Sequence, residues 1–77
     1  MRLEEAVASL AYPVVVEPLS AEDGGGFLAS APDLPGCMSD GETPEEALRA
    51  VQEAIAEWIE EARRLGREVP KPSRKAA

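Results

Sequence analysis

Residues 43–66 carry a complete set of helix signals, and a helix of this length limits what the rest of a short chain can form. Thr43 can cap the first turn, Pro44 suits the first helical position, and Glu46 completes a Thr-x-x-Glu capping box. Gly66 is placed to end the helix. One face of the predicted helix is apolar and consists of Leu48, Val51, Ile55, Trp58, Ile59, Ala62 and Leu65. Because such a face must be buried, the remaining residues have to supply a surface that covers it.

Three short segments before this helix have the composition of β-strands. Residues 12–17 contain a run of valines, residues 27–30 follow a glycine-rich turn, and residues 37–39 follow a proline-rich crossing segment. After the helix, residues 67–70 are extended enough to form a short edge strand. We therefore expect an α+β fold, a small antiparallel sheet with one long helix packed on it, in the order α-β-β-β-α-β.

The first helix of that order is a short amphipathic segment over residues 1–11. Leu3, Val7 and Leu10 recur at the spacing of one helical face. A helix this short is not stable alone, so we expect these three residues to form an oligomer contact in a homo-dimer or tetramer. The chain then divides into this N-terminal helix, a domain over residues 12–70 and a basic tail over residues 71–77.

The charges are distributed unevenly along the chain. It has 15 acidic and 8 basic residues, a net charge of −7, and no Lys or Arg lies between Leu3 and Leu48. This region should repel phosphate backbones, so direct nucleic-acid binding is not expected. We interpret the basic residues near the C-terminus as a solvated helix end and tail. No apolar run could span a bilayer and the start is too acidic for a signal peptide, so we expect a cytoplasmic protein without a membrane partner.

Few residue types suited to catalysis are present. The chain has no histidine, and Cys37 is its single cysteine, which excludes an internal disulfide, a paired-cysteine zinc site and a Cys-His pair. We expect neither enzymatic activity nor a bound cofactor or metal. The alternative is a metal-dependent nuclease, in which Glu17, Asp33 and Asp40 would hold divalent ions.

Several blocks of the sequence together resemble one protein family. Tyr-Pro-Val-Val-Val-Glu-Pro precedes a glycine-rich turn, and Phe-Leu-Ala-Ser-Ala-Pro-Asp-Leu-Pro-Gly-Cys and Gly-Glu-Thr-Pro-Glu-Glu-Ala follow it. Over residues 12–73 this pattern resembles the HicB-like antitoxins of type II toxin–antitoxin systems. The resemblance implies a partial ribonuclease H-like fold and a protein that binds and neutralises a HicA-type toxin, a small basic RNA-cleaving protein that uses a histidine. Full-length members often carry a C-terminal DNA-binding domain, and we expect the short form without one.

We expect the toxin to meet a rigid turn and the carboxylates near it, because rigid loops lose little entropy on binding. The predicted contact residues are Glu17, Pro32, Asp33, Leu34, Pro35, Gly36, Asp40 and Glu42. Two alternatives stay open. Residues 32–36 can be a tight corner that the fold alone requires, and the protein can be a stand-alone homo-oligomeric scaffold or ligand-binding domain.

Overall fold

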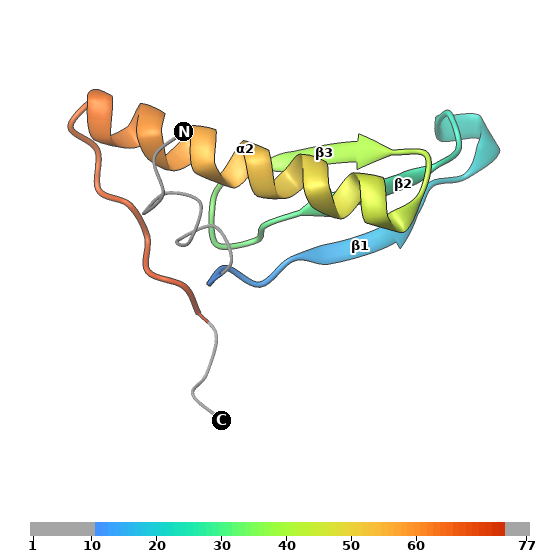
Figure 1. Cartoon of the computed structure of the whole chain (residues 1–77), viewed down its shortest axis with the longest axis horizontal. Coiled ribbons are helices and arrows are strands. Elements are labelled where there is room, and N and C mark those ends of the chain that lie inside the picture. The colour runs from blue at the N-terminus through green and yellow to red at the C-terminus, as the bar shows by residue number, and fades with distance from the viewer. Residues whose placement is uncertain (1–10, 74–77) are drawn as a thin grey trace.

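In the computed structural model, which describes residues 11–73, one long helix lies across a three-stranded antiparallel sheet (Figure 1). The strands follow the chain order β1-β2-β3 across the sheet. The predicted α+β class, with a small sheet and one long helix, is confirmed. The predicted helix over residues 1–11, with Leu3, Val7 and Leu10, lies outside the described residues. The elements are β1 (Val15–Pro18), the 3₁₀ turn η1 (Ala21–Asp23), β2 (Phe27–Ser30), β3 (Met38–Gly41) and α2 (Pro44–Arg64).

Side-chain and backbone caps fix both ends of α2. The Glu46 N–H donates to Thr43 Oγ1 at 3.1 Å, which is the predicted cap. The Glu46 carboxylate reaches back to the N–H of Glu42 at 3.1 Å, one residue earlier than in the usual capping box. At the other end Gly66 has φ +73°, and the Arg67 N–H reaches the carbonyl of Ala62 at 2.7 Å. This Schellman arrangement reverses the chain after the helix.

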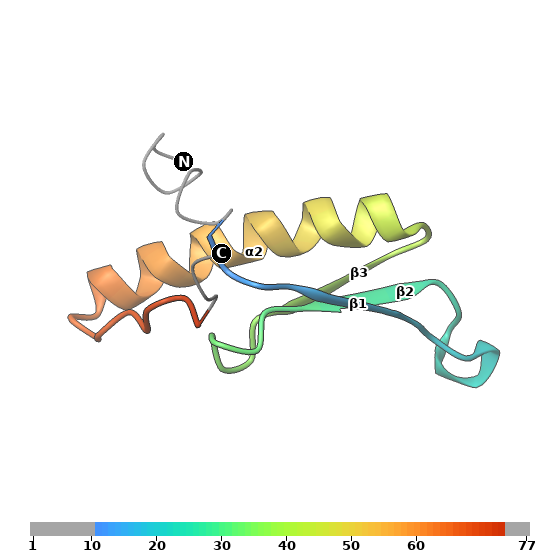
Figure 2. The same ribbon diagram turned by 90° about the horizontal axis from the view of Figure 1, so that it is seen from below.

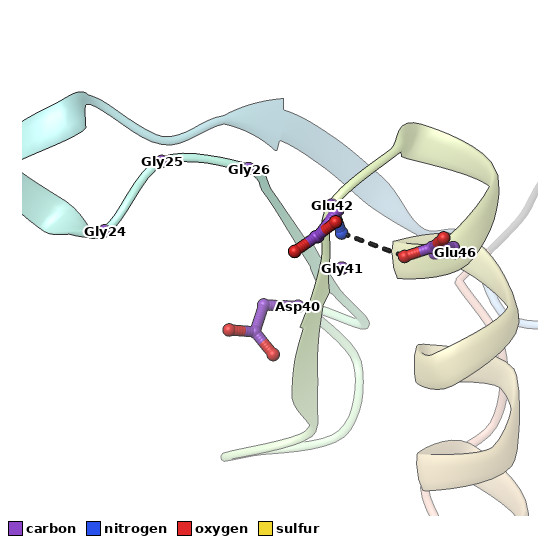
Figure 3. A pocket seen from close by; sticks show the side chains of 7 residues that line it. All are labelled: Gly24, Gly25, Gly26, Asp40, Gly41, Glu42 and Glu46. Atoms are coloured by element: carbon purple, nitrogen blue, oxygen red, sulfur yellow. Dashed lines mark hydrogen bonds between the residues drawn. The ribbon is translucent and has the colours of Figure 1, made fainter.

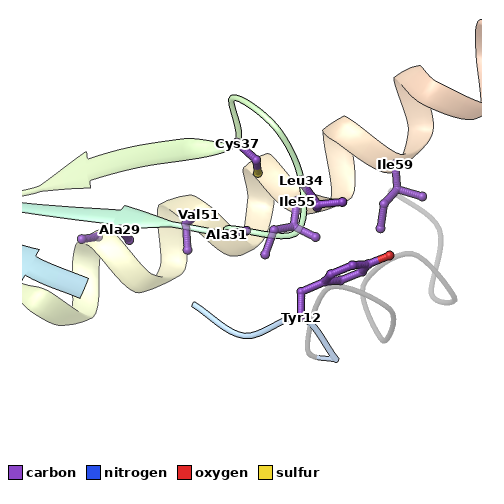
Figure 4. Close-up of a cluster of buried hydrophobic side chains, with 9 residues drawn as sticks. Tyr12, Ala29, Ala31, Leu34, Cys37, Val51, Ile55 and Ile59 are labelled. Atoms are coloured by element: carbon purple, nitrogen blue, oxygen red, sulfur yellow. The ribbon is translucent and has the colours of Figure 1, made fainter. Parts of the chain in front are cut away.

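The core lies between α2 and the sheet and extends past the end of the strands (Figure 4). Small side chains allow a close approach, since Ala29 and Ala47 are fully buried and a Cβ on Gly41 would lie 2.5 Å from the Ala47 nitrogen. Four-residue strands span only about 13 Å, whereas a 21-residue helix is about 32 Å long. The overhanging part of α2 is covered by other residues, among them Tyr12, Leu34 and Val69.

The predicted strand over residues 67–70 is wrong, because this segment is irregular and pairs with none of the strands within residues 11–73. It runs back beneath the end of α2, where Val69 packs against the core (Figure 2). The carbonyl of Pro70 accepts a hydrogen bond from the Tyr12 hydroxyl. Proline also has no N–H to give to a neighbouring strand. The relationship to the ribonuclease H-like fold stays a prediction.

Candidate partner-binding surface

The two faces of the sheet have different neighbours. Side chains alternate between the faces along each strand, and directly opposite residues share a face. Ala29 lies under α2 and is fully buried, so Leu28 and Ser30 on either side of it point away from the helix. Within residues 11–73, no other element packs on this second face (Figure 2).

The strand register determines which residues share the second face. Glu17 pairs with Leu28, and Leu28 pairs with Asp40, so two carboxylates flank one leucine. In the next row on this face, Ser30 lies between Val15 and Met38. Val15 is 48% exposed and Met38 is 55% exposed. We call these six residues the open face, and they are Val15, Glu17, Leu28, Ser30, Met38 and Asp40.

An acidic hollow of about 490 Å³ adjoins one end of the open face. Its walls are the glycine-rich loop, the end of β3 and the start of α2, and Asp40, Glu42 and Glu46 line it (Figure 3). Gly26 has φ +76°, and a Cβ there would lie 2.6 Å from the carbonyl oxygen of Gly41. Glycine therefore lets the loop lie directly against β3, which forms the hollow.

The charged side chains of the three strands and of the residues that line the hollow are all acidic. From residue 11 to Leu48 the chain contains carboxylates and no Lys or Arg. The cations of the described region are on α2 or after it, and they are Arg49, Arg63, Arg64, Arg67 and Lys71. Carboxylates that lie together without counter-charges create a negative potential that attracts a basic surface.

The predicted turn at residues 32–36 lies at the opposite end of the sheet from the acidic hollow. Leu34 is 1% exposed and belongs to the core, so little of its side chain is available to a partner in this structure. The Asp33 carboxylate accepts the N–H of Ser73 at 2.7 Å, and the carbonyl of Pro35 accepts the indole N–H of Trp58 at 3.0 Å. These contacts support the alternative in which the turn is a corner that the fold requires. Pro32, Pro35 and Gly36 remain exposed.

The structure divides the predicted contact residues into two groups. Glu17 and Asp40 share the open face, and Glu42 joins Asp40 in the acidic hollow. Residues 32–36 form the separate turn. Sequence reasoning missed Val15, Leu28, Met38 and Glu46. A period-two pattern can place alternate residues of one strand on one face, but the register between strands is needed to bring these residues together.

The carboxylates that a metal-dependent nuclease would use are not assembled. Asp33 lies in the turn, at the other end of the sheet from Glu17 and Asp40. Within the described part of the chain, no group of three His, Cys, Asp or Glu side chains is placed to hold a metal ion. Cys37 is 5% exposed, and its burial raises the pKa of the thiol. A thiol of this kind packs as a small apolar side chain.

The fold and the surface define a small α+β domain in which a helix covers one face of the sheet and the other face has an acidic border. The sequence matches the HicB-like antitoxins of bacterial toxin–antitoxin systems over residues 12–77. This chain therefore belongs to the HicB-like antitoxin family. None of the described helices is long and apolar enough to cross a membrane.

Individual relatives agree with this assignment. A UPF0150 protein of Synechocystis sp. is 37% identical over 59 residues, which cover 77% of this chain and 77% of that protein. A UPF0150 protein of Thermoplasma acidophilum is 32% identical over 60 residues, 78% of this chain and 83% of that protein. Antitoxin HicB 1 of Photorhabdus laumondii is 37% identical over 49 residues, 64% of this chain but only 30% of the longer relative.

Proposed function

We propose that this protein is a non-catalytic cytoplasmic antitoxin that binds and neutralises a small basic RNA-cleaving toxin of the HicA type. Membership of the antitoxin family supports the role. The observation that carries the proposal is the absence of any Lys or Arg from residue 11 to Leu48, the segment that builds the whole sheet.

The charge distribution explains how such a protein would act. A protein that cleaves RNA must bind phosphates, so it needs a cationic surface near its active site. An acidic protein competes for the same cations, and complementary charge speeds the encounter of the two proteins. Neutralisation then requires only that the antitoxin cover the RNA-binding surface, with no reaction of its own.

A stand-alone homo-oligomer is the second candidate, and the exposure of β1 favours it. Val15 and Val16 point to opposite faces of β1, and they are 48% and 37% exposed. Val15 lies on the open face, and Val16 is only partly covered because α2 lies mainly over β2 and β3. The outer edge of β1 has no paired strand among residues 11–73. Apolar edge strands of this kind pair readily with another chain.

Co-expression with the small basic protein encoded beside this chain tests the proposal. We expect the basic protein alone to stop growth and to cleave RNA in vitro, and the pair to grow normally and to purify together. An unrelated acidic protein of the same net charge is the matched control, and it should not restore growth. Arrested growth in cells that contain both proteins, with RNA cleavage unchanged by this chain, would refute the antitoxin role. The homo-oligomeric scaffold would then be the better account.

A further inference from the structure

The open face combines apolar and acidic side chains in a way that the covered face of the sheet does not. Val15, Leu28 and Met38 supply apolar area, and the Glu17 and Asp40 carboxylates lie on either side of Leu28. Protein interfaces place apolar contacts in the centre, where water is excluded, and charged groups around them. The open face contains both kinds of side chain, with Leu28 on the middle strand between the two carboxylates.

The charges of the open face distinguish between classes of occupant. Nucleic acid would be repelled by Glu17 and Asp40 and would find no cation on the three strands. A second copy placed face to face would bring the carboxylates of two acidic chains together, and like charges in contact are unfavourable. A basic protein meets neither penalty, because its Lys and Arg side chains pair with the carboxylates while its apolar side chains cover Val15 and Met38.

We propose that the open face is the surface on which the basic toxin docks, with Val15, Leu28 and Met38 against apolar side chains and Glu17 and Asp40 paired with cations that otherwise hold RNA phosphates. This inference rests on the proposed function and specifies its site. The docking surface differs from the turn at residues 32–36, which packs against α2 and the C-terminal segment.

The size of the sheet indicates that the contact extends beyond the open face. Three strands of four residues cover an area of about 13 Å by 14 Å. This is about 200 Å², whereas a stable interface buries about 800 Å² on each partner. Asp40 belongs to both the open face and the acidic hollow, so the hollow is the natural continuation of the contact. Glu42 and Glu46 would then meet further cations.

Paired substitutions test the docking surface by isothermal titration against the small basic protein encoded beside this chain. Val15→Thr with Met38→Gln removes apolar contact, and Glu17→Gln with Asp40→Asn removes two charges. All four side chains are exposed, so folding should be unaffected, as circular dichroism would verify. We expect each pair to weaken binding about 10-fold or more.

Matched controls separate a local effect from a general one. Glu53→Gln with Glu57→Gln removes the same charge from the exposed side of α2, and Leu65→Gln removes an apolar side chain that is 48% exposed near the helix end. These variants should bind within about 3-fold of the wild type. The affinity of the wild type should also fall more steeply with salt than that of the Glu17→Gln, Asp40→Asn pair.

Each result decides between the function and its site. If the wild type binds and neutralises the basic protein but the open-face variants bind equally well, the docking site is wrong and the function stands. If the wild type does not bind, both are wrong. If light scattering shows a wild-type dimer that Val15→Thr with Met38→Gln dissociates while toxin binding persists, the open face is a contact between copies and the proposal is overturned.

Discussion

Leu34 and Met38 are apolar side chains of similar size, four residues apart, and replacing each with alanine should have very different effects on stability. Leu34 is 1% exposed in the core, whereas Met38 is 55% exposed on the open face. Removing a buried leucine side chain costs about 2–5 kcal/mol, from lost transfer free energy and the cavity left behind. We expect about 3 kcal/mol for Leu34→Ala. An exposed side chain makes few such contacts, so Met38→Ala should change the free energy of unfolding by less than about 0.5 kcal/mol.

The loss at Leu34 is large for a domain of this size. A chain of 77 residues has a free energy of unfolding of about 4–12 kcal/mol. At about 4–8 °C per kcal/mol, Leu34→Ala should lower Tm by about 12–24 °C. Urea unfolding followed by the fluorescence of Trp58, the single tryptophan, measures both variants. A free energy of unfolding for Leu34→Ala within 0.5 kcal/mol of the wild type would refute the placement of Leu34 in the core and restore it as a candidate contact residue.

Three further predictions concern the cap, the tyrosine and the buried thiol. Thr43→Ala should lower the free energy of unfolding, measured in urea, by about 1 kcal/mol, because the N–H of Glu46 loses its acceptor. Thr43→Ser keeps a hydroxyl acceptor, so it should retain most of the stabilisation that the cap provides. Burial raises the pKa of Tyr12, with a further contribution from the charge of Asp33, so its phenol is neutral in the folded state. The stabilisation by the neutral phenol is present below pH 10.0 and is lost as the pH rises through the folded-state pKa of Tyr12. A Tyr12→Phe variant should therefore lose less thermal stability at alkaline pH than the wild type, which melting curves recorded over a range of pH would measure. Burial also raises the pKa of Cys37, so its reaction with a disulfide reagent should be slow in the native protein and fast in urea; equal rates would show that the thiol is accessible.

The helix and the middle strand were predictable because their signals are local. Thr43, Pro44 and Gly66 mark the helix ends through backbone preferences that do not depend on the rest of the fold. Residues 27–30 form β2 as predicted, between a glycine loop and a proline-rich turn. The segment at residues 67–70 has the composition of a strand, but a strand also needs a partner with free N–H and C=O groups. Here the Pro70 carbonyl accepts a hydrogen bond from the Tyr12 hydroxyl instead of from a neighbouring strand.

The candidate surface depended on contacts that a local pattern does not contain. Leu34 sits between prolines and a glycine, which is typical of an exposed turn, yet the turn folds over the helix overhang and buries this side chain. Glu17 and Asp40 are far apart in sequence. They share a face because Glu17 of β1 and Asp40 of β3 both pair with Leu28 of β2, the strand between them. Composition indicated an acidic surface, and only the register showed which apolar residues lie within it.

Chemical-shift mapping by NMR tests the central claim most directly. The ¹⁵N-labelled chain would be titrated with an inactive variant of the small basic protein encoded beside it, and the amide shifts of the two faces compared. The account predicts that the largest changes occur at Val15, Leu28 and Asp40, while the amides of Glu53 and Glu57 on the exposed side of α2 stay in place. Changes concentrated on α2, or a spectrum that does not change at all, would contradict it.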